Sequence, residues 1–127
     1  MADTYRPGQC NIGGRERRKR LAVGGVAAVA AVVLAAAVVV LDWPPVALFA
    51  TVGPLFGAFL GYLQARRAFC TGFALQGRYD VGDESGTVTD ADARAADKVA
   101  ARHLHRDAAV AAVVVAGLVT ALGVVLL

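Results

Sequence analysis

The stretch LAVGGVAAVAAVVLAAAVVVL, residues 21–41, decides the fold of this 127-residue chain. It holds no charged and no polar side chain. As a helix it would rise about 31 Å, which is close to the thickness of a hydrocarbon core. Its many valines would favour a strand in water, but a lone strand in lipid leaves its backbone groups unpaired. We therefore expect a first transmembrane helix here.

Two further apolar stretches lie at residues 45–65 and 108–127, and a short turn containing Trp43 joins the first two as a hairpin. We expect a kink at Pro54, near the middle of the second stretch, with the Thr51 hydroxyl as a local hydrogen-bond partner. The whole chain is 57% hydrophobic, 18% charged and has a mean hydropathy of +0.57. The predicted fold class is all-α, a three-span helical integral membrane protein.

The polar segment at residues 66–107 is predicted to be a loop and a stalk helix. Residues 68–75 would continue the second helix or lie in the membrane interface, and residues 76–86 would form a loop. Residues 91–107 are rich in alanine and free of glycine and proline, so they would form a helix that runs straight into the third span as a long cytoplasmic extension. Thr87 and Thr89 are alternative caps for it.

The predicted stalk would project about 27 Å from the bilayer as a solvated helix. An ion pair between Asp90 and Arg94 is expected at i, i+4 spacing. A thin apolar stripe could dock the tail, the loop or a second copy of the stalk, although alanine buries little area. The stripe consists of Ala93, Ala96, Ala100 and Leu104.

Basic residues set the expected orientation. Lysine and arginine lie in the tail at residues 1–20 and in the loop at 66–107, while the turn at 42–45 has none. The positive-inside rule therefore predicts a cell-membrane protein with a cytoplasmic N-terminus and an external C-terminus. A cleaved signal peptide with a twin-arginine start at Arg17 and Arg18 is the alternative interpretation of the first stretch.

Glycine recurs at every fourth position of the second span, at Gly53, Gly57 and Gly61, which exposes bare backbone on one helix face. Close helix packing is therefore expected. The partner could be another span of the same chain, for which a small-residue row in the third span is available, or another molecule. That row consists of Ala112, Ala116 and Thr120.

A basic cluster precedes the first span and is expected to contact anionic lipid head groups, or to serve only as a topology determinant. It consists of Arg15, Arg17, Arg18, Lys19 and Arg20. No aromatic side chain interleaves it, so nucleic-acid binding is not expected.

Two cysteines, Cys10 and Cys70, are too few for a disulfide scaffold and are far apart in sequence. The predicted topology places both on the cytoplasmic side. Cys10 could be a solvated thiol and Cys70 a small apolar filler beside Phe69 and Phe73, or the two thiols could meet. Two thiolates and one imidazole, from His103 or His105, would make an incomplete zinc set that needs a fourth ligand such as Asp107 or water, so no metal or cofactor is predicted.

The segments Cys10-Asn11-Ile12-Gly13 and Cys70-Thr71-Gly72-Phe73-Ala74 are the most distinctive motifs. On them the chain resembles short uncharacterised multi-pass membrane proteins with a C-N-I-G tail motif and a C-x-G-F-A segment after the second span. The resemblance implies a family identity and no activity.

The spans hold no acid, base or histidine, and the chain has no Ser/His/Asp set, zincin motif or P-loop. We therefore expect no enzyme. The leading function is that of a small accessory or structural subunit, or an assembly factor, that packs through the glycine face against another membrane protein or a second copy. The alternatives are a thiol or metal sensor on the cytoplasmic face and a minimal oligomeric channel or transporter.

Overall fold

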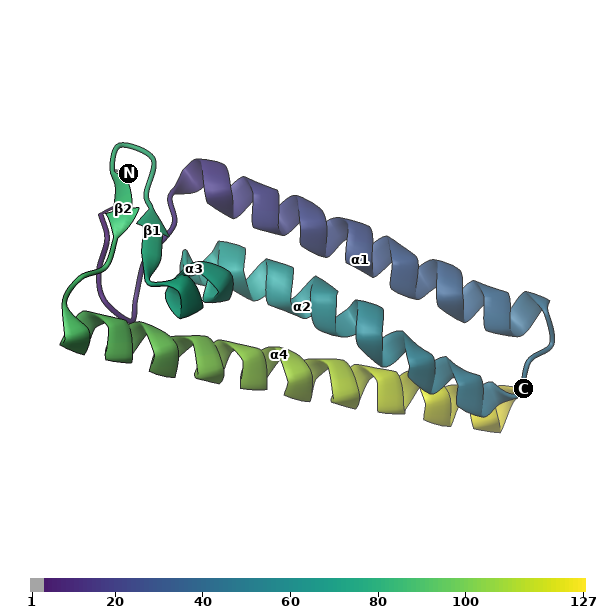
Figure 1. The fold of residues 1–127 in the computed structure, drawn as a ribbon. Helices are drawn as coiled ribbons and strands as arrows, with labels where there is room; N and C mark the ends of the chain where they lie inside the picture. The colour runs from purple at the N-terminus through teal and green to yellow at the C-terminus, as the bar shows by residue number, and fades with distance from the viewer. Residues whose placement is uncertain (1–3) are drawn as a thin grey trace.

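The computed structural model describes residues 4–127 and is mostly helical (Figure 1). Its elements are α1 (Gly14–Val40), the 3-10 helix η1 (Pro45–Thr51), α2 (Val52–Arg67), α3 (Thr71–Gln76), β1 (Arg78–Asp80), β2 (Ser85–Thr87) and α4 (Ala91–Leu126). Within this part of the chain, three helical segments are long and apolar enough to cross a membrane: α1, η1 with α2, and α4.

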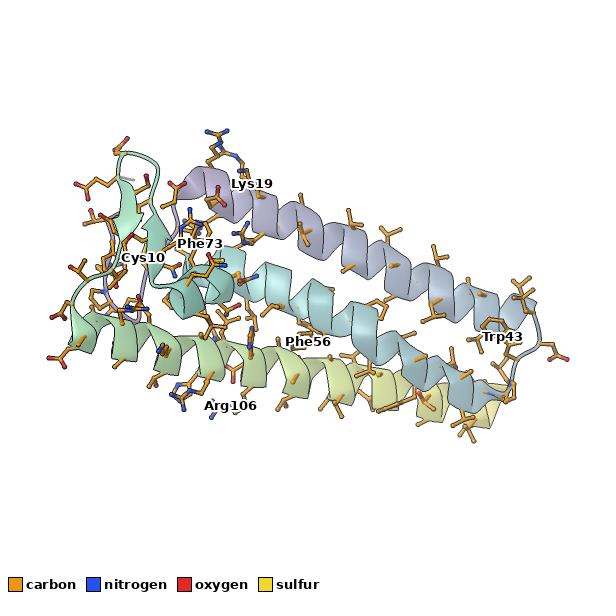
Figure 2. The ribbon with its side chains drawn as sticks, viewed as in Figure 1. Cys10, Lys19, Trp43, Phe56, Phe73 and Arg106 are labelled. Atoms are coloured by element: carbon orange, nitrogen blue, oxygen red, sulfur yellow. The ribbon has the colours of Figure 1, made fainter. Side chains whose placement is uncertain are left out.

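The three long helical segments lie side by side, and the shorter elements gather at one end of the bundle (Figure 1). We call this end the cap and define it as residues 4–13, residues 68–90 and the first half of α4. Trp43 lies at the opposite end, in the connection between α1 and η1 (Figure 2). The arrangement gives an apolar bundle about as long as a bilayer is thick, with a polar structure at one end.

The second span changes from a 3-10 helix to an α-helix after Thr51, shortly before Pro54. Pro54 lies in the first turn of α2, where its missing N–H costs no helical hydrogen bond, and residues 45–51 before it are wound as the tighter 3-10 helix. The Thr51 hydroxyl donates to the Leu48 carbonyl at 2.7 Å, within that segment. Pro54 therefore stands at the start of the α-helix and not in its middle.

The second helix ends at Arg67 and does not continue through residue 75. Ala68 adopts a left-handed conformation with φ of 53°, which ends the helix, and the chain then re-forms a helix as α3. Phe69 is buried on α4 in a small core with Ala74 and Leu104. Residues 68–75 thus pack inside the cap as a separate turn and short helix.

The expected loop at residues 76–86 is also wrong in part, because β1 and β2 form an antiparallel hairpin there. Arg78 pairs with Thr87 and Asp80 with Ser85. An isolated two-stranded hairpin is marginal, but β1 gains a second neighbour from the tail, since Ile12 bridges to Asp80 in parallel. The sequence pattern of the segment alone could not reveal that partner.

Helix α4 is one continuous helix from the cap to the chain end, as predicted. The predicted N-cap residues of this helix, Thr87 and Thr89, are wrong. The N-cap residue is Asp90, whose side chain accepts a hydrogen bond from the Ala93 N–H at 2.9 Å. Asp90 is therefore a capping residue, and the Arg94 guanidinium lies over Gly77 instead of pairing with it.

The first half of α4 is covered by the rest of the cap and is not a solvated stalk. Its buried row is Ala93, Asp97, Ala101 and Leu104. The predicted apolar stripe has the same first and last residues as this row. Its two middle residues, Ala96 and Ala100, each come one position before the buried ones and are half-buried. The row continues into the span as Ala108, Ala112 and Ala116, each fully buried.

Candidate functional site

The glycine row of α2 divides between two environments. A Cβ built on Gly61 would lie 2.6 Å from the Arg20 carbonyl oxygen and 2.7 Å from Gly24 Cα, so only glycine permits this approach of α1. A Cβ on Gly57 would meet the Ala27 methyl at 3.2 Å. Gly53 has no heavy atom within 4 Å of such a Cβ. Two members of the row therefore pack on the first span, and the third is open.

The basic cluster, expected in a tail that ends at residue 20, belongs to the first turns of α1, because the helix already begins at Gly14. Two of its arginines turn inward: Arg17 Nε donates to the Ala65 carbonyl at 2.7 Å, and Arg20 lies against Cys70 and the Phe73 ring. The others are exposed. Buried Glu16 is bound by Lys19 at 3.0 Å and by Arg20 at 3.3 Å.

A basic groove of about 430 Å³ lies between the start of α1 and the end of α2. Its lining residues are Gly14, Arg17, Arg18, Leu21, Tyr62, Ala65 and Arg66. An apolar groove of about 430 Å³ continues from it along the same two helices. This second groove is lined by Leu21, Gly24, Gly25, Ala28, Leu55, Ala58, Phe59 and Tyr62.

The two sequence motifs meet through Asn11, which is fully buried. Its side-chain amide donates to the Cys70 carbonyl at 2.9 Å, and its side-chain oxygen accepts from the Cys70 N–H at 2.6 Å. The tail backbone adds a bond from Asn11 N–H to the Ala68 carbonyl at 3.0 Å. The Asn11 side chain thus pairs with both the N–H and the C=O of one residue, as a neighbouring strand would, which explains an asparagine at this position.

Both cysteines are buried and free, with exposed fractions of 3% for Cys10 and 4% for Cys70. The interpretation of Cys10 as a solvated thiol is therefore wrong: the tail folds inward, and the Cys10 thiol points to the Ile12 carbonyl at 3.6 Å. The Cys70 sulfur accepts a hydrogen bond from Arg20 at 3.3 Å. Figure 2 shows Cys10 inside the cap, where the thiols serve as small packed side chains.

The two histidines lie in different environments, as their spacing predicts. His105 Nε2 lies 3.0 Å from the Thr71 hydroxyl, and its ring lies 6.1 Å from that of Phe56. His103 is exposed beside Arg67, and Arg67 pairs with Asp107 at 2.9 Å. Residues 4–127 contain no group of three His, Cys, Asp or Glu side chains that could hold a metal ion.

Asp97 is the main residue that the sequence interpretation missed. It is fully buried in α4 and accepts two hydrogen bonds of 2.7 Å, one from the Tyr5 hydroxyl and one from the Gly8 N–H. The Tyr5 ring stacks on Tyr79 with 4.8 Å between centroids. Burial, followed by the hydrogen bond to the Asp97 carboxylate, raises the pKa of Tyr5 well above its ordinary value. Asp97 therefore fastens the tail to α4.

A signal for this role was present in the sequence. Asp97 lies four residues after Ala93, a member of the predicted apolar stripe, so a helical wheel places its carboxylate beside that stripe. A buried carboxylate needs donors, and the glycine-containing tail can bring backbone N–H groups close to it.

The chain was compared with protein-family models, curated proteins and solved structures. No protein-family model matches the chain, and no significant match was found among curated proteins or solved structures.

Proposed function

We propose that this chain is a small accessory subunit or assembly factor of a larger membrane assembly, without enzymatic activity of its own. It would lie in the cell membrane with the cap in the cytoplasm and Leu127 outside. The positive-inside rule supports this orientation, because the basic residues gather at the cap end of the bundle. Figure 2 shows Arg106 extending outward from α4 near that end.

The observation that carries the proposal is the open position at Gly53. Gly57 and Gly61, the other two members of the glycine row, pack against α1. Gly53 is exposed on the surface of α2, and no side chain covers its backbone. Helices associate in lipid by close packing over small residues, because lipid tails remove the hydrophobic driving force. An exposed glycine between Val52 and Pro54 therefore suits contact with a span of another membrane protein.

The outer surfaces of the bundle support the same proposal. Only 17% of the residues in the most apolar window of each span are fully buried within the chain, so each helix keeps surface that can face lipid or a partner. Gly117 of α4, like Gly53, has no heavy atom within 4 Å of a built Cβ.

The test is affinity purification of the full chain from native membranes with quantification of co-purifying proteins. Gly53→Leu should lose a specific membrane partner by about tenfold or more, since each 1.4 kcal/mol is tenfold and a lost close contact removes that much. Ala121→Leu is the matched control, because it adds the same side chain at an exposed position of α4. The purified Gly53→Leu protein should keep wild-type thermal stability.

Three outcomes would contradict the proposal. The first is a partner profile unchanged by Gly53→Leu, and the second is an equal loss in both variants. The third is that the protein co-purifies only with a second copy of itself.

A further inference from the structure

The basic and apolar grooves are two halves of one continuous depression. They share Leu21 and Tyr62, and both run between α1 and α2. Leu21 is also the first residue of the uncharged first span. The junction between the grooves therefore coincides with the level at which head groups meet acyl chains in the proposed membrane placement.

The polar half is built for an anion. Three guanidinium groups line it, from Arg17, Arg18 and Arg66, and its described lining residues include no acid. Arg17 is held in place by its bond to the Ala65 carbonyl, and Arg66 donates to the Tyr62 hydroxyl at 3.2 Å. The nearby carboxylate of Glu16 is already bound by Lys19 and Arg20. Guanidinium groups in this arrangement bind phosphate oxygens well.

The apolar half is built for a chain of methylene groups. Gly24, Gly25, Ala28 and Ala58 leave its floor with little side-chain cover, and Leu55 and Phe59 add apolar wall. From Leu21 to Ala28 it extends about 10 Å along α1. Gly25 has open space around a built Cβ, so the groove is not filled by the chain itself.

We propose that this depression binds one anionic phospholipid, with its phosphate among the three guanidinium groups and an acyl chain in the apolar groove. A soluble phosphate would leave the apolar half empty, and an uncharged partner helix would leave the guanidinium groups without an anion. Only an amphiphile with a negative head matches both halves. The inference rests on the proposed membrane placement but not on any protein partner.

The experiment uses the full-length protein, delipidated in mild detergent and titrated with phosphatidylglycerol or phosphatidylcholine of equal chain length. Native mass spectrometry measures the bound fraction. One phosphatidylglycerol should bind per chain. Arg18→Gln with Arg66→Gln should weaken binding about 25-fold, because each cation near an anionic head group contributes ~1 kcal/mol, or about fivefold. Arg102→Gln with Arg106→Gln is the control of equal charge change on exposed residues of α4.

A second variant tests the apolar half without touching a charge. Gly25→Leu should fill the groove and weaken binding of both lipids by about tenfold, which is the scale of one buried side chain. Gly117→Leu, at another open glycine, should leave binding unchanged.

The proposal is overturned if both double-arginine variants bind equally, if Gly25→Leu binds like wild type, or if glycerophosphate competes as well as the lipid does. It is also overturned if Gly25→Leu removes a co-purifying protein while lipid affinity stays unchanged, because the groove would then hold a helix. Failure of the accessory function alone would leave these titrations as expected, since they use isolated protein.

Discussion

Replacement of Asp97 by alanine should release the N-terminal tail from α4. The carboxylate accepts short hydrogen bonds from the Tyr5 hydroxyl and the Gly8 N–H, both at 2.7 Å. A hydrogen bond to a charged group contributes about 1.5–3 kcal/mol, so the pair contributes about 3–6 kcal/mol. Replacement by alanine also removes the cost of burying the carboxylate. The expected loss in the free energy of opening the tail is therefore at the lower end of this range, about 3 kcal/mol.

Cys10 provides the assay, because it is buried in the same tail and becomes accessible only when the tail opens. The rate of its alkylation by a maleimide, followed by mass spectrometry, reports the population of the open state. A loss of about 3 kcal/mol corresponds to an increase of about 100-fold in that rate. Asp97→Asn should raise the rate less than tenfold, since an amide can accept from Gly8 and donate to Tyr5.

Asp92→Ala is the matched control, because Asp92 is exposed in the first turn of the same helix. It should leave the alkylation rate within a factor of about two. The reasoning is refuted if Asp97→Ala alkylates Cys10 no faster than this control while far-ultraviolet circular dichroism shows both proteins folded.

Three further measurements test other parts of the structure. Gly61→Ala should clash with α1, lower the thermal aggregation temperature and reduce the free energy of unfolding by about 1–3 kcal/mol. Gly53→Ala should change neither quantity, and equal behaviour of the two variants would refute the packing assignment. The pKa of Tyr5 is raised, so the stability it adds is present below pH 10 and lost as the pH rises through its folded-state value; the stability difference between wild type and Tyr5→Phe should therefore vanish well above pH 10. In intact cells an impermeant thiol reagent should label a cysteine appended after Leu127 and spare Ser85→Cys, and labelling at position 85 would reverse the proposed orientation.

The long helices could be predicted because their signal is local. Residues 21–41 contain no proline and no polar side chain, and the alanine-rich start of α4 lacks glycine and proline. Composition and length therefore suffice for α1, the second span and α4, with boundaries shifted by a few residues. The basic residues of α1 were placed in a tail only because arginine and lysine marked the end of the apolar stretch.

The cap could not be predicted because its contacts join segments that are distant in sequence. Asn11 and Cys70 are 59 positions apart, and Tyr5 and Asp97 are 92 apart. The hairpin of β1 and β2 depends on a bridge from Ile12, and the end of α2 depends on a left-handed alanine that no propensity favours. The sequence motifs around Cys10 and Cys70 point to the two sulfur atoms, whereas the contact between the motifs is made by the Asn11 side chain and the Cys70 backbone.

The same distribution of contacts bears on how the chain reaches its topology. Asn11 bonds to the backbone of Cys70, and the tail also bonds to the carboxylate of Asp97, so in the proposed membrane placement the cap closes only when all three segments emerge on one side of the bilayer. A chain threaded with one span reversed would strand the Asp97 carboxylate without its donors and leave the cap apart. Under the proposed topology, closure of the cap would therefore distinguish a correctly inserted chain from a misinserted one, and it would require Asp97 at the start of α4 to be in place.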